Sequence, residues 1–114
     1  MRKINTTTKT NKKNISELPT RKELLLKSLQ NKKEAQAYLQ ASLNAYQQDD
    51  NKEALLLALR NLAQAQGGMT SIAKKANMNR EALYRTLSSR GNPTLTNFGK
   101  ILGALGFQLV AKLS

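Results

Sequence analysis

Residues 69–93 read MTSIAKKANMNREALYRTLSSRGNP and predict two short helices joined by a sharp turn. Thr70 and Asn79 are candidate N-caps, because their side-chain oxygens can accept hydrogen bonds from the free N–H groups of a first helical turn. Asn77 lies at the corner, where glycine is usual and asparagine is the next most tolerant residue at positive φ. The stretch therefore predicts a helix-turn-helix, which places its second helix in the DNA major groove.

Helical spacing separates an inward from an outward face in this stretch. The residues expected to face inward are Ile72, Ala73, Ala76, Met78, Leu83 and Leu87. The opposite face of the second helix carries Arg80, Glu81, Tyr84, Arg85 and Ser88. Two arginines, a tyrosine and one acid form a face that can contact base edges and phosphates. The alternative is an ordinary two-helix corner whose outer face is only solvated.

The charge of the chain favours a polyanionic partner. The 114 residues include 19 Lys/Arg against 7 Asp/Glu, a formal net charge of +12, and a strongly basic chain most simply binds nucleic acid. Residues 1–33 carry a net charge of +8 and residues 69–114 a net charge of +6, whereas residues 34–68 carry −2. The half that holds the helix-turn-helix is therefore basic, and the middle of the chain is mildly acidic.

The composition argues against an enzyme and against a bound metal or other cofactor. The chain has no cysteine and no histidine, which excludes thiolate chemistry and His-based catalytic pairs. Ser88, Ser89 and Tyr84 are the nucleophile-like groups of the central stretch, and no general base accompanies them. The basic start is not followed by an apolar segment, so it does not predict a secretory signal. The absence of cysteine fits a reducing compartment, so we expect a cytoplasmic protein.

Three parts are expected along the chain. Residues 1–19 are a polar, basic arm that we expect to be disordered in isolation. This arm contacts DNA, solubilises the chain, or becomes ordered against a protein partner. Residues 20–50 form an N-terminal helical segment that opens on a capping box at Thr20 and Glu23. Residues 51–114 form the helix-turn-helix domain, which ends in a short strand.

Further helices are expected on both sides of the central stretch. They cover residues 20–29, 31–47, 52–66 and 94–105. The apolar stripe of the second, which runs from Ala35 to Tyr46, packs on a neighbouring helix or forms a face for a protein partner. Asp50 with Glu53 is the expected cap of the third, which is apolar almost all round and therefore central to a core.

The last helix and the C-terminal residues complete the predicted fold. Thr94 is the expected cap, Gly67-Gly68 and Gly106 end helices, and Gly99 with Gly103 would allow the close approach of another backbone. The inward residues expected of the last helix are Leu95, Phe98, Leu102 and Leu105. Residues 107–113 alternate like a strand, which needs a partner in a second subunit, in another protein or in its own chain. The expected fold class is all-α with this one short strand.

The residues resemble a known family. LLLALRNLAQAQGGMTSIAKKANMNREALYRTLSSRGNPTLTNFGKILGALG, residues 55–106, resembles the lambda-repressor-like (Cro/C1-type) helix-turn-helix of HigA-like antitoxins, the addiction-module antidote proteins. The GGMT start, the NREALYRTLS helix, the RGNPTL loop and the terminal ALG carry the resemblance. The upstream LLLKSLQNKKEAQAYLQASL resembles the leader of that family, so the likeness covers roughly residues 22–113.

The resemblance implies a bacterial or phage-derived regulator that binds operator DNA as a homodimer and binds a RelE/HigB-like toxin that cleaves mRNA. Its DNA-binding positions match Thr70, Ser71, Asn79, Arg80, Glu81, Tyr84, Arg85, Arg90 and Asn92. We therefore expect an antitoxin that neutralises such a toxin and represses its own operon. The alternatives are a stand-alone phage-type repressor without a toxin, and a protein that chiefly caps a toxin through its N-terminal helices.

Overall fold

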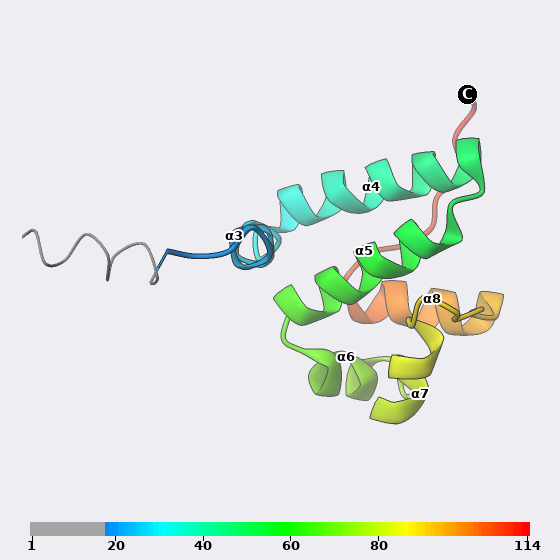
Figure 1. The fold of residues 1–114 in the computed structure, drawn as a ribbon. Helices are drawn as coiled ribbons and strands as arrows, with labels where there is room; N and C mark the ends of the chain where they lie inside the picture. The colour runs from blue at the N-terminus through cyan, green and yellow to red at the C-terminus, as the bar shows by residue number, and fades with distance from the viewer. Residues whose placement is uncertain (1–17) are drawn as a thin grey trace, which may run out of the picture.

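The most apolar helix of the chain, α5 (Lys52–Ala65), lies at the centre of the computed structural model, which describes residues 18–114. It packs against α3, α4 and α6. Figure 1 shows α4 along one side of α5 and the group α6, α7 and α8 on the other. The prediction of a central third helix is confirmed, since α5 buries residues on most of its circumference.

Five further helices surround α5 in the described part of the chain. Their bounds are α3 Arg21–Ser28, α4 Lys32–Asp49, α6 Met69–Lys75, α7 Arg80–Thr86 and α8 Leu95–Ala104. Every helix except α3 contributes buried side chains to one apolar core. The largest fully buried side chains are Leu29, Leu56, Leu59, Leu62, Ile72, Leu83, Leu87, Ile101, Leu102 and Leu105. The all-α class is therefore confirmed, and the core links the N-terminal helices to the helix-turn-helix stretch.

Side-chain caps begin most of the helices, as the sequence predicts. Thr20 and Glu23 form the expected capping box at α3, with the Glu23 N–H donating to Thr20 Oγ1 at 3.1 Å and the Thr20 N–H donating to Glu23 Oε1 at 2.8 Å. Thr94 caps α8. The predicted cap of α5 was wrong, because Asn51 rather than Asp50 accepts from the Ala54 N–H. Asp50 instead ends α4 in a left-handed conformation at φ 54°.

Two helices end in the Schellman arrangement that their glycines predict. After α5, Gly67 has φ 128° and the Gly68 N–H donates to the Ala63 carbonyl at 2.8 Å. After α8, Gly106 has φ 88° and the Phe107 N–H donates to the Leu102 carbonyl at 2.8 Å. Both bonds satisfy carbonyl groups that the end of a helix leaves free. These glycines are required because the backbone is left-handed at each stop.

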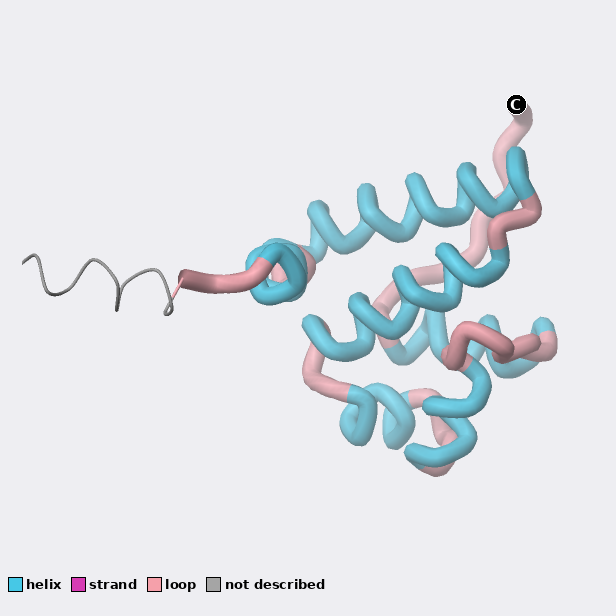
Figure 2. The backbone as a smooth tube through the Cα atoms, in the orientation of Figure 1, coloured by secondary structure: helices cyan, strands magenta, loops and turns pink. Residues whose placement is uncertain are grey.

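The predicted C-terminal strand was wrong. Residues 107–114 have no regular secondary structure, and Figure 2 shows no strand in the described residues 18–114. A strand needs a neighbouring strand to pair its backbone groups, and no other described segment is extended enough to supply one. Phe107 packs partly against the core, whereas Leu109, Val110 and Leu113 are exposed. The alternating side-chain pattern of residues 107–113 therefore does not correspond to a strand in a sheet.

One expectation for α8 was also wrong. Leu95 was expected to face inward, but it is 80% exposed. It is the first residue of α8, whose buried residues, Ile101 and Leu102, lie further along the helix. Gly99 and Gly103 were expected to permit the close approach of a backbone. A Cβ at either glycine would meet nothing within 4 Å, so no described segment of this chain approaches them, and the expectation is not tested by contacts within the chain. The predicted arm lies mostly in residues 1–17, outside the described residues.

Candidate nucleic-acid interface

The helices α6 and α7 are joined by a tight turn of four residues, 76–79. Asn77 has φ 57°, and the Met78 N–H donates to the Ala73 carbonyl at 2.9 Å while the Asn77 N–H donates to the Lys74 carbonyl at 3.1 Å. This is the same Schellman arrangement that glycines make elsewhere in the chain. Two short helices with a turn of this length have the form of a helix-turn-helix, and the left-handed conformation predicted for Asn77 is confirmed.

Helix α7 is divided into a buried and an exposed face. Leu83 and the C-cap residue Leu87 are fully buried, and they join Ile72 and Ala73 of α6 in the core. Four of the five side chains predicted to face outward are exposed: Arg80, Glu81, Tyr84 and Arg85. The fifth, Ser88, follows α7 and is half-buried, and its hydroxyl donates to the Arg85 carbonyl at 2.9 Å. The predicted division of this helix is therefore confirmed, and the structure brings these four residues together on one helix face.

Arg80 and Tyr84 form a pair on that face, one helical turn apart. The Arg80 guanidinium carbon lies 5.2 Å from the centroid of the Tyr84 ring, and Arg80 Nη2 donates to Tyr84 Oη at 3.4 Å. A guanidinium placed over an aromatic face is attracted by the ring's negative face and loses part of its rotamer freedom. The pair therefore presents Arg80 donors in a restricted direction, although both side chains remain exposed.

Thr70 and Ser71 lie in the first turn of α6, as predicted, but Thr70 is not the cap. Helix α6 begins at Met69, and Gly68 is the N-cap residue at φ 96° without a side-chain hydrogen bond. Met69 is buried in the core, and the helix begins two residues earlier than the polar pattern indicates. Thr70 is exposed and Ser71 half-buried, so the Thr70 hydroxyl is free of the capping role that the sequence predicts.

Asn79 caps α7, as the sequence predicts. Its Oδ1 accepts from the Ala82 N–H at 2.7 Å. The capping bond occupies the side-chain oxygen and leaves the Nδ2 amide group as the part that can contact another molecule.

Asn79→Ala is expected to lower the free energy of unfolding by about 1 kcal/mol, because it removes the acceptor for a free N–H of α7. Urea unfolding followed by circular dichroism measures this loss. Asn79→Asp is the matched control, since a carboxylate also accepts this bond and is favourable at a helix N-terminus. Equal stability of the alanine variant and the unaltered chain would contradict the capping role.

Arg90 and Asn92 follow α7 in the loop that leads to α8, and the Asn92 side chain is bonded to another helix. Both are exposed. Asn92 Oδ1 accepts from Lys52 Nζ of α5 at 3.5 Å, which directs this side chain towards α5 rather than towards the exposed face of α7. Gly91 between them is buried, and its N–H donates to the Ser88 carbonyl at 2.8 Å. The loop is therefore folded tightly against the end of α7.

The structure adds residues that the sequence reasoning missed. The Arg60 guanidinium of α5 donates to the carbonyl oxygen of Leu87 at the end of α7. A positive charge at this position also interacts favourably with the negative end of the helix dipole. A lone arginine in an apolar helix was its only sequence signal. Lys74 and Lys75 are exposed in the last turn of α6, and this adjacent basic pair was visible in the sequence. Both additions increase the positive charge around α7.

Within the described residues, neither a candidate metal site nor a helix that could span a membrane is found. Within residues 18–114, no cluster of three or more acidic side chains is arranged to hold a metal ion. None of the helices in this range combines the length and the apolar character that crossing a membrane requires.

Comparison with known proteins places the chain in a family. A family model described as "Probable addiction module antidote protein" matches residues 23–113. The chain belongs to this antidote family. The chain is also 41% identical over 76 residues to an uncharacterized protein of Haemophilus influenzae, an alignment that covers 67% of the chain and 77% of the relative. No solved structure matches the chain. The antidote family implies a toxin partner for this chain.

Proposed function

We propose that this antidote is a sequence-specific DNA-binding antitoxin that represses its own operon and neutralises a RelE/HigB-like toxin. The observation that carries the DNA-binding half is the α6–turn–α7 unit, whose second helix is fixed by Leu83 and Leu87 and turns two arginines and a tyrosine outward. The antidote family supports the antitoxin half. In this role the protein is a non-enzymatic, cofactor-free, cytoplasmic and nucleoid-associated regulator.

In the proposed complex, α7 enters the major groove with its N-terminal end leading. Arg80 and Arg85 make the main guanine or phosphate contacts, because a guanidinium can donate two bonds to guanine O6 and N7. The Asn79 amide and Tyr84 make flanking contacts, with Glu81 accepting from cytosine. The start of α6 and the loop after α7 contact phosphates, through Thr70 and Ser71 and through Arg90. The family resemblance also gives Asn92 this role, but its side chain is directed towards Lys52 of α5, so it is not part of the proposed interface. These contacts fix the register of α7 on the duplex.

A homodimer completes the proposed operator complex. Helix α7 has seven residues, about 10 Å at 1.5 Å per residue, and a helix of that length contacts only a few base pairs. Dimeric helix-turn-helix proteins read two half-sites one helical turn apart, about 34 Å. The resemblance of the sequence to the lambda-repressor-like helix-turn-helix of HigA-like antitoxins supports this arrangement. A stand-alone phage-type repressor would share it, and a toxin gene beside this one separates the two functions.

Titration of the protein against the duplex upstream of its own coding sequence tests the proposal. The control is a scrambled duplex of the same composition, and both are titrated at two salt concentrations. We expect a preference for the native duplex that persists at the higher salt. Equal binding to both duplexes, lost together as salt rises, would mean that charge alone drives association and would remove α7 from the role of a recognition helix.

Arg85→Ala is expected to weaken binding to the native duplex by roughly 1–3 kcal/mol if the side chain contacts a base. If Arg85 contacts only phosphate, binding to both duplexes falls alike and the salt slope decreases by about one unit. Fluorescence anisotropy over a salt series distinguishes the two results.

Arg21→Ala is the matched control for Arg85, because Arg21 is an exposed arginine in α3, on the other side of α5 from α7 in Figure 1. Its loss removes the same charge without touching the proposed interface. An Arg85 variant that behaves like the Arg21 variant would exclude Arg85 from the DNA contact.

A further inference from the structure

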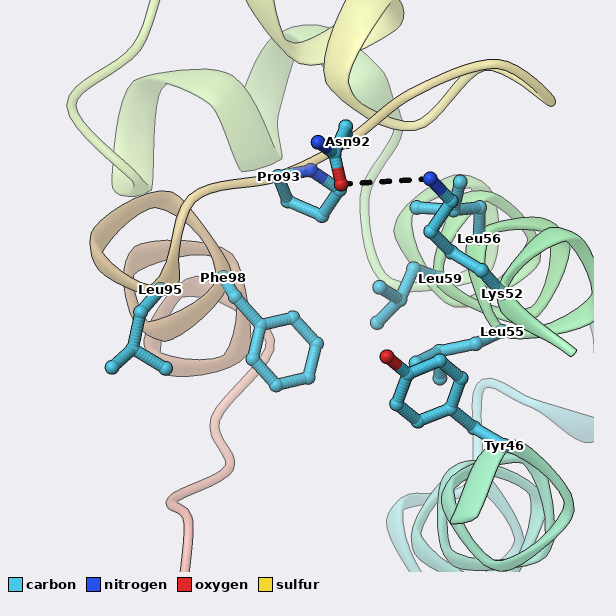
Figure 3. A pocket seen from close by; sticks show the side chains of 9 residues that line it. All are labelled: Tyr46, Lys52, Leu55, Leu56, Leu59, Asn92, Pro93, Leu95 and Phe98. Atoms are coloured by element: carbon cyan, nitrogen blue, oxygen red, sulfur yellow. Dashed lines mark hydrogen bonds between the residues drawn. The ribbon is translucent and has the colours of Figure 1, made fainter. Parts of the chain in front are cut away.

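A hollow of about 310 Å³ opens on the flank of the molecule, between the end of α4, the start of α5 and the start of α8. Its lining is mainly apolar and includes Tyr46, Leu55, Leu59, Pro93, Leu95 and Phe98. Figure 3 shows the Phe98 ring directed from α8 towards Leu55 and the Tyr46 ring. Leu95 is 80% exposed and Tyr46 is 40% exposed. Large exposed side chains around an apolar recess mark a surface suited to contact with another molecule.

The polar side chains of the lining favour a protein over a small molecule as the occupant. Lys52 Nζ donates to Asn92 Oδ1 at 3.5 Å across the hollow (Figure 3), so these two groups are engaged with each other. The Tyr46 hydroxyl is the remaining polar side-chain group of the lining. A small-molecule site fixes its ligand through several polar groups that converge on it, whereas an apolar side chain of a partner protein needs no such group.

Acidic side chains lie beside the hollow, where α4 turns into α5. Asp49, Asp50 and Glu53, three of the seven acidic residues of the chain, are exposed there, and we call them the acidic corner. Tyr46 and Lys52 of the lining come from the same segment. In a chain whose formal net charge is +12, this corner repels nucleic-acid phosphates and attracts basic side chains. The occupant must therefore combine apolar and basic groups.

The toxin of the proposed function has this chemistry. A protein that binds and cleaves mRNA presents a basic surface, because its substrate is a polyanion. The exposed cations around α7, which are Lys74, Lys75, Arg80 and Arg85, repel such a surface. Within residues 18–114, the acidic corner is the one place where three carboxylates lie within five sequence positions. The adjoining hollow supplies the apolar centre that a specific protein interface contains.

We propose that the hollow and the acidic corner together are the surface that binds the toxin. An apolar side chain of the toxin packs between Leu95 and Tyr46, and basic side chains of its RNA-binding surface meet the acidic corner. The inference rests on the proposed antitoxin function, which by itself assigns no surface to the toxin. Binding in this way covers part of the surface that the toxin needs for RNA, which is a direct route to neutralisation.

Association and dissociation rates, measured with full-length antidote variants at two salt concentrations, test the apolar half of this surface. The probe is the RelE/HigB-like protein encoded beside this chain, immobilised on a biosensor. Leu95→Ala should raise Kd about tenfold at both salt concentrations, mainly through faster dissociation, because it truncates a side chain at the centre of the interface without changing charge. Leu24→Ala is the matched control, since Leu24 is a 55% exposed leucine in α3, away from the hollow.

A second variant, Asp49→Asn combined with Glu53→Gln, tests the acidic half and nearly preserves side-chain size. It should slow association about tenfold at the lower salt concentration and less at the higher one, because salt screens attraction between exposed charges. Glu34→Gln is the matched control. Glu34, like Glu53, is an exposed glutamate in the first turn of its helix, but it lies about 18 Å along α4 from Tyr46 at 1.5 Å per residue.

The outcomes separate this surface from the proposed function. A toxin that binds the unaltered chain and both hollow variants with equal rate constants would overturn the surface and leave the antitoxin function standing. A Leu95→Ala variant that loses self-association in sedimentation velocity would assign the hollow to a second copy and would equally overturn the inference. A toxin that does not bind the unaltered chain, or the absence of a toxin gene beside it, would remove the antitoxin function and this surface together.

Titration with the native and scrambled duplexes checks that the hollow variants remain folded. Leu95→Ala should keep the duplex binding of the unaltered chain, because Leu95 lies outside the proposed DNA contacts. A variant that loses toxin binding and keeps its circular dichroism spectrum and its duplex binding has lost a local contact, as the inference requires. Loss of all three together would show that the substitution acts through unfolding, and would overturn the role of Leu95 as a contact residue.

Discussion

Leu83→Ala is expected to lower the free energy of unfolding by roughly 2–5 kcal/mol, which is the range for removing a fully buried leucine side chain. Leu83 is 0% exposed and joins α7 to the core that α5, α6 and α8 share. The free energy of unfolding of a small domain is about 5–15 kcal/mol in total, so the variant loses a large part of its stability. Thermal unfolding followed by circular dichroism measures the loss.

Leu57→Ala is the matched control for Leu83. Leu57 is also a helical leucine, but it is 46% exposed on α5, so its removal leaves no enclosed cavity. We expect the free energy of unfolding to change by less than about 1 kcal/mol, because alanine also has a higher helix propensity than leucine. Equal losses in the two variants would show that Leu83 does not anchor α7. Undocking of α7 should also abolish any preference for the native duplex.

Gly91→Ala is expected to destabilise the protein by about 3 kcal/mol, at the upper end for overpacking a buried site. A Cβ at Gly91 would lie 2.0 Å from the Thr86 carbonyl oxygen, and this neighbour is backbone that cannot rotate away. The chain after α7 must therefore move outward, which also disturbs the loop that carries Arg90 and Asn92. Urea unfolding and duplex titration of the same variant report both effects.

Gly103→Ala provides a control of opposite sign. Gly103 lies within α8, and a Cβ there would meet nothing within 4 Å. Alanine favours a helix over glycine by roughly 0.5–1 kcal/mol, so this variant should be more stable than the unaltered chain. A stable Gly91→Ala variant would contradict the close backbone approach after α7, whatever the result for Gly103.

Much of the fold could be predicted because its signals are local. A cap such as Asn79 or Thr94 acts within one helical turn, and the left-handed stop at Asn77 depends on a few neighbouring backbone groups. The division of α7 into inward Leu83 and outward Arg80 follows from its period of 3.6 residues. These features were therefore visible in the sequence before any tertiary contact was known.

The sequence-based predictions failed where two local signals compete, or where contacts with distant segments determine the structure. Asp50 and Asn51 are both good capping residues, and the direction in which α4 turns into α5 selected Asn51. Burial of Met69 moved the start of α6 ahead of Thr70. Residues 107–113 alternate like a strand, but no neighbouring strand is present in residues 18–114 to pair with them. A strand depends on its partner in a way that a helix does not.

Local sequence signals were enough to predict the helices, most of their caps and stops, and the residue types on the outer face of α7, because these depend on contacts within one or two turns. The tertiary structure was needed to show which distant residues meet around the end of α7 and the loop after it. The Arg60 bond to Leu87, the contact of Lys52 with Asn92 and the hollow beside Leu95 join residues far apart in the chain. Such contacts depend on how whole helices pack, which no local pattern records.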